Sequence, residues 1–406
     1  MRTKLLLISV ILLPIFIDMK ILFILNTFYA TGNGLSSSAR RTVEALKAAG
    51  QDVRIVSGPN DDPNGPQPYY RLKWYHFPLV QPIIDAHGYH FASTDKKILE
   101  EAIRWADVVH MEEPFVLEVN AYKIAKKLGK PVTGTYHLHP ENVFSSLWLG
   151  WCKTANFLLL HAWRDLAFND WSHIQCPTQN VCDRLVRHHF KSKLHVFSNG
   201  LVPDACIRSD VPPEDYLDPQ RPLKVVYIGR LSEEKDQPTL IRAIRHSAFA
   251  DRIQLQFAGH GPKAKQYKRM AMKLYEDGVV KHKPEFVFCT RDELRTLAAG
   301  ADLCIHCATT EVEGLSIMEA LQQGAVPVIA KGRHTGAYQF ALDDRSIFQE
   351  KDHQELAQKI DWWLSHPKER WEEGKRYVKS MEQYDIANSA QSLIKMYQEA
   401  IADSMP

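Results

Sequence analysis

Two glutamates that flank a glycine-containing turn are the residues whose types and spacing best suit chemistry. Glu311 and Glu319 are separated by seven residues, which include Gly314 and Ser316. The apolar run Leu303–His306 before them predicts a buried strand, and the residues after Gly314 have a helical pattern. At such a turn the free N–H groups and the positive end of the helix dipole bind anions. We expect Ser316 to cap the first helical turn.

A cationic segment upstream, residues 227–235, contains Gly229, Arg230 and Lys235. A guanidinium can donate two parallel hydrogen bonds to phosphate oxygens, and an ammonium acts as a point charge. Pre-positioned cations are the strongest means of stabilising the charge that builds on a departing diphosphate. The two segments together predict one site for a diphosphate and another for a sugar and a ribose.

We expect no metal ion at this site. The acidic pair Asp61-Asp62 lies in a loop rich in proline, asparagine and glycine, where turn formation explains it. Cys304 and Cys307 form a Cys-x-x-Cys, but they fall in a predicted buried strand without a second pair nearby. Arg230, Lys235 and the helix N-terminus can neutralise a diphosphate without a cation.

The Glu-x7-Glu segment, followed by Ala-Leu-Gln-Gln-Gly, resembles the signature of retaining nucleotide-sugar glycosyltransferases of the GT-B fold, the group 1, family 4 type. The Gly229-Arg230 … Lys235 segment is similar to the diphosphate clamp of that family. The resemblance covers nearly the whole chain from Met19 onward. It implies an α/β fold in which two Rossmann-like, doubly wound domains face each other across a cleft.

The resemblance also implies the reaction. The donor is a nucleoside-diphosphate hexose, which we expect to be a UDP-sugar, and it is a co-substrate, so that no cofactor is needed. Transfer proceeds with retention by front-face attack, in which the departing phosphate takes the proton of the acceptor. Glu319 binds the ribose hydroxyls and Glu311 the sugar hydroxyls. The residues expected to act in catalysis are His137, Glu311, Arg230 and Lys235. The residues expected to bind the donor are Gly34, Gly229, Arg230, Lys235, Phe288, Glu311, Gly314, Leu315, Ser316 and Glu319.

One residue departs from the family pattern. The family usually has an aromatic or apolar residue two positions after the first glutamate, and this chain has Glu313. The backbone of the turn can still bind phosphate, but the identity of the donor sugar stays open.

A polar segment follows the predicted strand that begins at Pro131. Ligands of open α/β sheets bind at the carboxyl ends of the strands, where this chain places Thr135-Tyr136-His137. His137 matches the Thr-x-His position that the family uses near the reacting sugar. Downstream of it, His139, Glu141 and Asn142 are the residues expected to contact the acceptor.

Alternating strands and helices divide the chain into two parts. We expect an N-terminal acceptor domain over residues 19–205 and a C-terminal donor domain over residues 222–384, joined by a proline-rich linker. By resemblance, the final helix, 385–406, crosses back onto the first domain. Residues 1–18 are an apolar extension that is short for a membrane span. It is either an over-extended start, with Met19 as initiator, or a membrane-surface anchor, because no cleavage site of a signal peptide follows.

Composition argues against a nucleic-acid partner and indicates the compartment in which the protein works. The 406-residue chain has a formal net charge of +2, and no basic block is long enough to indicate a nucleic-acid partner. Its seven scattered cysteines show no disulfide framework and favour a reducing compartment. We expect a cytoplasmic protein that can contact the inner face of the cell membrane peripherally.

The acceptor is the least determined part of the reaction. Residues 144–171 are rich in tryptophan and phenylalanine, and residues 184–193 are basic. Such segments can lie on a membrane surface, but aromatic residues at helical spacing are equally typical of a protein core. We favour a lipid acceptor such as diacylglycerol or ceramide. The alternatives are a glycosyltransferase of cell-surface polysaccharide synthesis and a non-catalytic sensor of sugar nucleotides.

Overall fold

The structure is a computed structural model, and it describes residues 18–30, 34–78, 81, 84, 89–146 and 149–405. The apolar extension lies outside the described residues except for Asp18, so neither interpretation of it is tested. The same holds for residues 31–33, which precede the predicted donor-binding residue Gly34, and for Trp148 of the aromatic segment.

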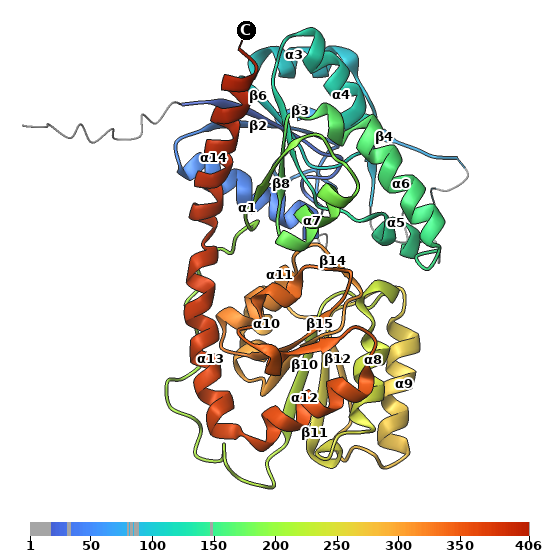
Figure 1. The fold of residues 1–406 in the computed structure, drawn as a ribbon, viewed down its shortest axis with the longest axis vertical. Coiled ribbons are helices and arrows are strands. Elements are labelled where there is room, and N and C mark those ends of the chain that lie inside the picture. Colours follow the sequence, from blue (N-terminus) through green and yellow to red (C-terminus); the bar gives the residue numbers. More distant parts are fainter. Residues whose placement is uncertain are drawn as a thin grey trace, which may run out of the picture.

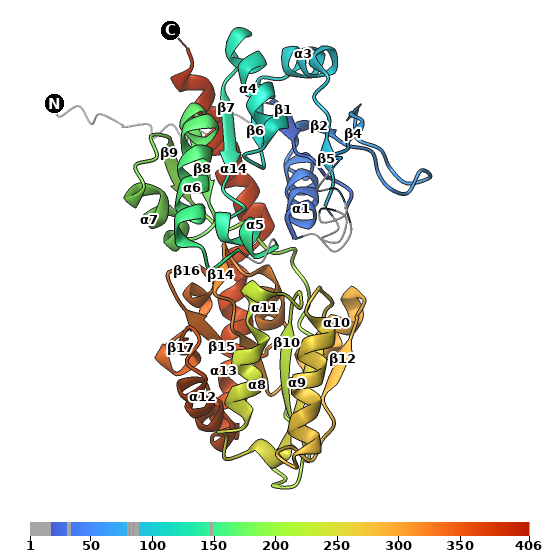
Figure 2. The same cartoon turned by 90° about the vertical axis from the view of Figure 1, so that its right-hand side faces the viewer.

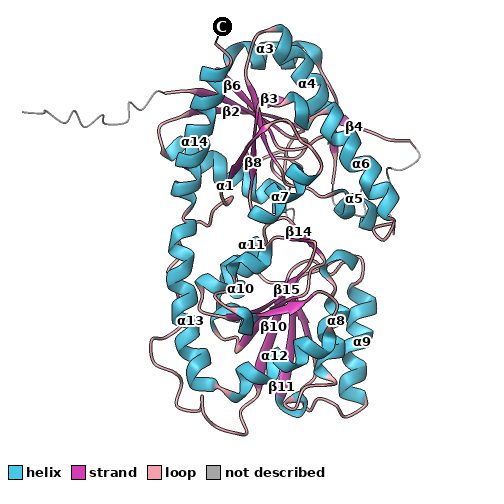
Figure 3. Ribbon diagram, in the orientation of Figure 1, coloured by secondary structure: helices cyan, strands magenta, loops and turns pink. Residues whose placement is uncertain are grey.

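A seven-stranded parallel sheet forms the centre of the first domain (Figures 1 and 3). Its central strands are mostly buried, as expected for a parallel sheet that is covered on both faces. In β1, for example, the residues from Ile21 to Ile24 are all buried, and Ile21 pairs with Val53 on one side and Val108 on the other. In spatial order the strands are β3 (Tyr70–Arg71), β2 (Asp52–Ser57), β1 (Lys20–Ile24), β6 (Val108–Met111), β7 (Val132–Thr135), β8 (His173–Cys176) and β9 (Lys193–Val196).

Helices cover both faces of this sheet, and each face has its own apolar core. The helices are α1 (Gly34–Ala48), α3 (Lys96–Trp105), α4 (Val116–Lys127), α5 (Pro140–Ser146), α6 (Lys153–Leu166) and α7 (Gln179–Arg187), with the 3-10 turn η1 (Phe168–Asp170). A short antiparallel pair, β4 (Trp74–Tyr75) and β5 (Phe91–Ala92), lies beside them.

The second domain repeats this design around a six-stranded parallel sheet and a single apolar core. Its strands are β12 (Glu285–Val287), β11 (Ile253–Ala258), β10 (Leu223–Ile228), β13 (Leu303–His306), β15 (Val326–Lys331) and β17 (Ile347–Gln349), and a small parallel pair is formed by β14 (Thr310–Glu311) and β16 (His334–Thr335). Its helices are α8 (Gln237–Ile244), α9 (Ala264–Glu276), α10 (Arg291–Ala299), α11 (Leu315–Gln322), α12 (His353–Ser365) and α13 (Pro367–Met381), with the 3-10 turns η2 (Glu233–Lys235), η3 (Ala250–Arg252), η4 (Ala337–Phe340), η5 (Asp344–Ser346) and η6 (Glu382–Tyr384). The predicted fold of two Rossmann-like domains facing each other is confirmed (Figure 2).

The last helix, α14 (Ile386–Asp403), packs on the first domain, where Leu393 and Tyr397 join the core that β1 forms with α1 (Figure 1). The chain thus passes between the domains twice, and the two passages touch. Leu201 donates its N–H to the carbonyl of Tyr384 at 2.7 Å and accepts from the N–H of Ile386 at 2.8 Å. A Cβ at Gly200, whose φ is +84°, would lie 2.7 Å from the Cα of Ile386.

The aromatic segment divides between core and surface. Trp163, Phe168 and Trp171 are buried, whereas Trp151 and Phe157 are 73% and 52% exposed. Among the described residues, no helix combines the length and apolar character needed to cross a membrane. All seven cysteines are free, and burial raises the pKa of Cys304 to about 12.

Candidate active site

The turn before α11 requires a glycine. Gly314 is the N-cap residue and has a φ of +99°, and a Cβ there would lie 2.9 Å from the Cβ of Ala337. The prediction that Ser316 caps the helix is wrong, because the helix begins one residue earlier, at Leu315. The cap residue therefore has no side chain to accept from the first N–H groups of α11. These donors point into the turn, where they suit an anion.

Glu311 lies at the centre of a group that we call the donor-side cluster: Lys235, His306 and Glu311. The Lys235 ammonium forms an ion pair with Oε2 of Glu311, and Nε2 of His306 lies 3.4 Å from the same oxygen. Burial acts to raise the pKa of the Glu311 carboxyl, but the Lys235 charge and His306 overcome it and lower the pKa to about 2. Glu311 is therefore a permanent acceptor, ready for sugar hydroxyls.

Two glycine-containing loops hold the backbone of the clamp segment. A Cβ at Gly259 would lie 2.1 Å from the carbonyl oxygen of Gly229, so the loops can only pack this closely without side chains there. The hydroxyl of Tyr227 donates to the carbonyl of Lys235 at 2.6 Å, and Gln237 donates to the carbonyl of Arg230 at 2.8 Å. The segment that carries both predicted cations is thus fixed through its main chain.

A shallow groove lies beside this segment at the end of β12. Leu231, Gly259, His260, Lys268 and Phe288 are among the residues that line it. The Phe288 side chain is 82% exposed, and its ring centre lies 6.2 Å from that of His260. An exposed ring next to a backbone edge suits stacking with a flat ligand.

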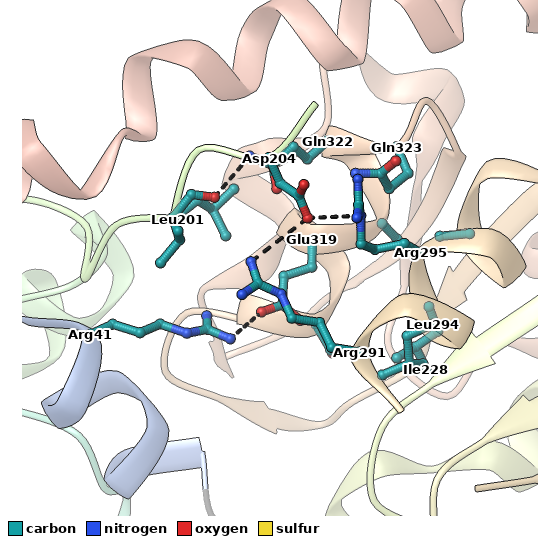
Figure 4. Close-up of a pocket in the computed structure, with 14 residues that line it drawn as sticks. Arg41, Leu201, Asp204, Ile228, Arg291, Leu294, Arg295, Glu319, Gln322 and Gln323 are labelled. Carbon is teal, nitrogen blue, oxygen red and sulfur yellow. Dashed lines mark hydrogen bonds and ion pairs between the residues drawn. The ribbon is translucent and has the colours of Figure 1, made fainter. Parts of the chain in front are cut away.

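Glu319 lies in a pocket between the domains (Figure 4). Its carboxylate accepts from Nη2 of Arg41 at 2.6 Å, across 278 residues of sequence. Arg291 and Arg295 line the same pocket, where Nε of Arg295 lies 2.8 Å from the carboxylate of Asp204. Arg41 therefore pairs with the carboxylate that was predicted to bind the ribose, and Arg291 and Arg295 pair with Asp204 in the same pocket.

His137 follows β7 at the carboxyl edge of the first sheet. Its Nε2 lies 2.6 Å from Oε2 of Glu112, which follows β6 in the same way. Burial acts to raise the pKa of Glu112, but His137 and His110 lower it to about 2. His137 also lies close enough to Glu313 of the second domain for its charge to oppose the burial that raises the pKa of that carboxyl. The structure thus brings His137 and the turn after Glu311 to the same interface.

The residues predicted to contact the acceptor form part of a second group, which we call the interdomain cluster: His139, Glu141, Arg184 and His334. Nη1 and Nη2 of Arg184 donate to the two carboxylate oxygens of Glu141 at 3.0 and 2.9 Å. Nη1 also lies 3.0 Å from Nδ1 of His139 and 2.9 Å from Nδ1 of His334, a residue of the second domain. Burial, followed by the Arg184 charge, lowers the pKa of His334 to about 4 and lowers that of His139. Both imidazoles are therefore neutral, and the cluster joins the two domains through one guanidinium.

Asn142 supports the turn beneath this cluster, since its Oδ1 accepts from the N–H of His139 at 3.0 Å. Glu141 is 8% exposed and His139 fully buried, whereas Asn142 is only half-buried. Of the three predicted acceptor contacts, Asn142 thus has the most accessible side chain. Gly34, predicted to bind the donor, is the exposed first residue of α1.

Glu313, the residue that departs from the family pattern, is buried between the domains. Its carboxylate accepts from the Ser198 hydroxyl and from the backbone and side-chain N–H groups of Asn199, the last of these at 2.6 Å. Burial raises its pKa to about 7, although these donors oppose the shift. A residue of the donor turn therefore holds the segment through which the chain leaves the first domain.

Sequence reasoning missed His306, Arg184 and His334 of the two clusters, and it also missed Glu112 and Arg41. Glu112 comes directly after β6, and a position at the carboxyl end of a strand was a signal that could have found it. Arg41 and Arg184 gave no such signal, because each belongs to an ordinary helical pattern and meets its partner only through the fold.

Comparison with known proteins agrees with this geometry. Residues 212–380 match the family described as Glycosyl transferases group 1, and residues 32–205 match Glycosyltransferase Family 4. The chain belongs to these glycosyltransferases. It is a nucleotide-sugar glycosyltransferase of the GT-B fold, in a family for which a retaining mechanism is typical.

Relatives of this glycosyltransferase act on different molecules. It is 25% identical to an alpha-monoglucosyldiacylglycerol synthase of Streptococcus pneumoniae, over 77% of this chain and 71% of that protein. It is 26% identical to a GDP-mannose-dependent alpha-mannosyltransferase of Corynebacterium glutamicum, over 77% and 72% of the two chains. The Anabaena protein HepE, solved with UDP and glucose, shares the fold with a TM-score of 0.69 at 16% identity, covering 94% of this chain and all of that one.

Proposed function

We propose that this glycosyltransferase transfers a hexose from a UDP-sugar to a membrane lipid such as diacylglycerol or ceramide, with retention and without a metal ion. The observation that best supports sugar transfer is the position of the donor-side cluster next to the N-terminus of α11. Lys235 lies against a permanently ionised Glu311. One group can thus bind the sugar while its neighbour and the helix N-terminus neutralise the diphosphate.

In the reaction, the bond between the anomeric carbon and the phosphate oxygen breaks, and a bond to the acceptor oxygen forms on the same face. The proton of the acceptor moves to the departing phosphate. Lys235, Arg230 and the N–H groups of α11 stabilise the charge on the diphosphate. Glu319 binds the ribose, so the nucleotide must replace Arg41 as the partner of this carboxylate.

His137 is proposed to contact the reacting sugar from the first domain. Glu112 fixes its ring, since a buried carboxylate 2.6 Å from Nε2 favours one orientation of the imidazole. Asn142 is proposed to contact the acceptor, and Glu141 and His139 to support it through Arg184.

A lipid acceptor is supported by an apolar and basic surface on the first domain. On α6, Phe157 and Leu158 are 52% and 62% exposed, and Val186 near the end of α7 is 59% exposed. The two helices adjoin here, because the Phe157 ring lies 6.0 Å from that of His188. Arg187 is also exposed, so the surface joins apolar side chains with positive charge, as binding to anionic lipid requires.

The test is a matrix of UDP-sugars against diacylglycerol, ceramide and saccharide acceptors, with products identified by mass spectrometry. We expect a glycolipid whose anomeric linkage, measured by NMR, matches that of the donor. EDTA should leave the rate unchanged. Transfer only to saccharides would support the polysaccharide alternative. A complete lack of both transfer and donor hydrolysis would favour a non-catalytic sensor.

The membrane contact has a separate test. Phe157→Ala combined with Leu158→Ala should reduce co-sedimentation with phosphatidylglycerol vesicles, while Tyr275→Ala, an exposed aromatic of the second domain, should not. Equal binding by all three proteins would refute the contact at α6.

A further inference from the structure

A second group of potential ligands lies away from the cleft, where the last helix meets the first domain. It consists of His173 at the start of β8, His195 in β9 and Glu399 on α14. One ligand atom from each lies within 4.8 Å of the others. Two imidazoles and a carboxylate are the donor set of many zinc sites.

The hydrogen bonds of this group fix how the rings are turned. Nδ1 of His173 lies 2.9 Å from Nε2 of His195, and Nε2 of His173 lies 3.1 Å from the carboxylate of Asp403. A carboxylate accepts, so Nε2 of His173 carries the proton and its Nδ1 lone pair points at His195. Metal-binding histidines show this same arrangement, in which the second nitrogen donates to a carboxylate.

Glu399 and Asp403 are four residues apart, so they lie on one face of α14. One can bind a cation while the other orients His173. Each carboxylate lies near Lys193, whose ammonium is 3.0 Å from Glu399 and 3.8 Å from Asp403. Lys193 is half exposed, and surface ion pairs of this kind contribute little to stability. A metal ion can therefore displace the Lys193 ammonium from Glu399.

We propose that His173, His195 and Glu399 bind one divalent transition-metal ion, preferably zinc, and that Asp403 orients His173. Imidazole nitrogen with carboxylate oxygen suits zinc better than magnesium or calcium, which prefer oxygen ligands alone. Three protein ligands leave the fourth tetrahedral position to water.

The position of the site determines what the ion does. His173 begins β8, so the ion lies at the amino edge of the sheet, opposite the carboxyl edge that carries His137. Its ligands join α14, which arrives from the second domain (Figure 1), to the strands β8 and β9 of the first. The ion therefore fastens the last helix to the first domain and takes no part in sugar transfer.

Calorimetric titration of the metal-free full-length chain with zinc chloride tests the site. We expect one ion per chain, with affinity at least tenfold lower in His195→Gln and in Glu399→Gln. Asp403→Asn should weaken binding by about 10- to 100-fold, as removal of an orienting carboxylate does elsewhere. Both altered ligands are only half-buried, so the variants should fold, and circular dichroism checks this.

Two variants control for zinc held by other histidines and for loss of charge. His246→Gln removes an exposed histidine of the second domain and should leave the titration unchanged. Lys193→Gln removes the competing ammonium and should leave affinity equal or higher. A wild-type chain that binds no zinc, or ligand variants that bind as tightly as the wild type, would overturn the proposal.

Melting curves give a second measurement. Zinc should raise the melting temperature of the wild type and of His246→Gln, because an ion that binds only the folded chain stabilises it. It should leave that of Glu399→Gln unchanged. An equal rise in all three proteins would refute binding at this site.

Discussion

The donor-side cluster and the interdomain cluster are both built on a carboxylate paired with one cation, yet they serve different purposes. Glu311 and Lys235 belong to the same domain and follow strands of one sheet. Glu141 and Arg184 belong to the first domain, but Arg184 continues to His334 of the second. The first pair is assembled before the domains meet, whereas the second is completed only when they do. The residues that bind the donor thus belong to one domain, whereas the residues of the interdomain cluster connect the two domains.

The largest effect that would sharpen this contrast is expected from Arg184→Met. The substitution leaves the buried Glu141 carboxylate without its cation, which costs about 3–5 kcal/mol of unfolding free energy. Urea denaturation measures it. Arg187→Met, one helical turn away and exposed, is the control and should change stability by less than about 0.5 kcal/mol. Equal stability of the two variants would remove the interdomain role of Arg184.

Lys235→Ala tests the other cluster. Loss of a charge aimed at the leaving group should lower kcat by about 10²–10³-fold. Steady-state kinetics with saturating donor measure it, and Lys273→Ala, on the exposed face of α9, provides the control. A rate within a factor of two of wild type would contradict a role in transfer.

Glu319→Gln tests the carboxylate that lies between the two clusters. Its loss as a charged acceptor for ribose hydroxyls should weaken UDP binding by about 10- to 100-fold, measured by calorimetry. The same change at Glu276, near the end of α9, should have no effect. Unchanged affinity in Glu319→Gln would show that this carboxylate pairs with Arg41 and does not bind the ribose.

The smallest effect is expected at Glu313, a donor-turn residue with interdomain partners. Its folded pKa of about 7 lies above the ordinary value of 4.5, so the folded chain prefers the protonated form. Its contribution to stability is complete below pH 4.5 and is lost as the pH rises through 7. Between about pH 6 and pH 8 the wild type should lose about 1 kcal/mol relative to Glu313→Gln. A constant difference between the two proteins in urea titrations would show that this carboxyl does not titrate there.

The features predicted best from the sequence are those that depend on residues close together in the chain. Apolar runs bounded by turns identified the strands, and the spacing of Glu311 and Glu319 located the turn into α11. The cap was wrong because the left-handed conformation of Gly314 starts the helix before Ser316, and local spacing does not distinguish the two.

Contacts between distant segments could not be predicted in this way. Arg41 and Glu319 are 278 residues apart, and nothing in α1 distinguishes Arg41 from its neighbour Arg40. The aromatic segment shows the same limit. The face that α6 presents to the sheet determines that Trp163 is buried while Phe157 is exposed, and this orientation depends on the fold.

The hydrogen bonds that tie Leu201 to Tyr384 and Ile386 have a consequence for motion. Because both interdomain passages of the backbone are bonded at one place, we expect that place to act as a hinge. We expect the domains to move as rigid bodies that rotate about this axis, with little sliding of one past the other. Access to the cleft would then be greatest at the edge farthest from Leu201, and substrates would enter and leave on that side.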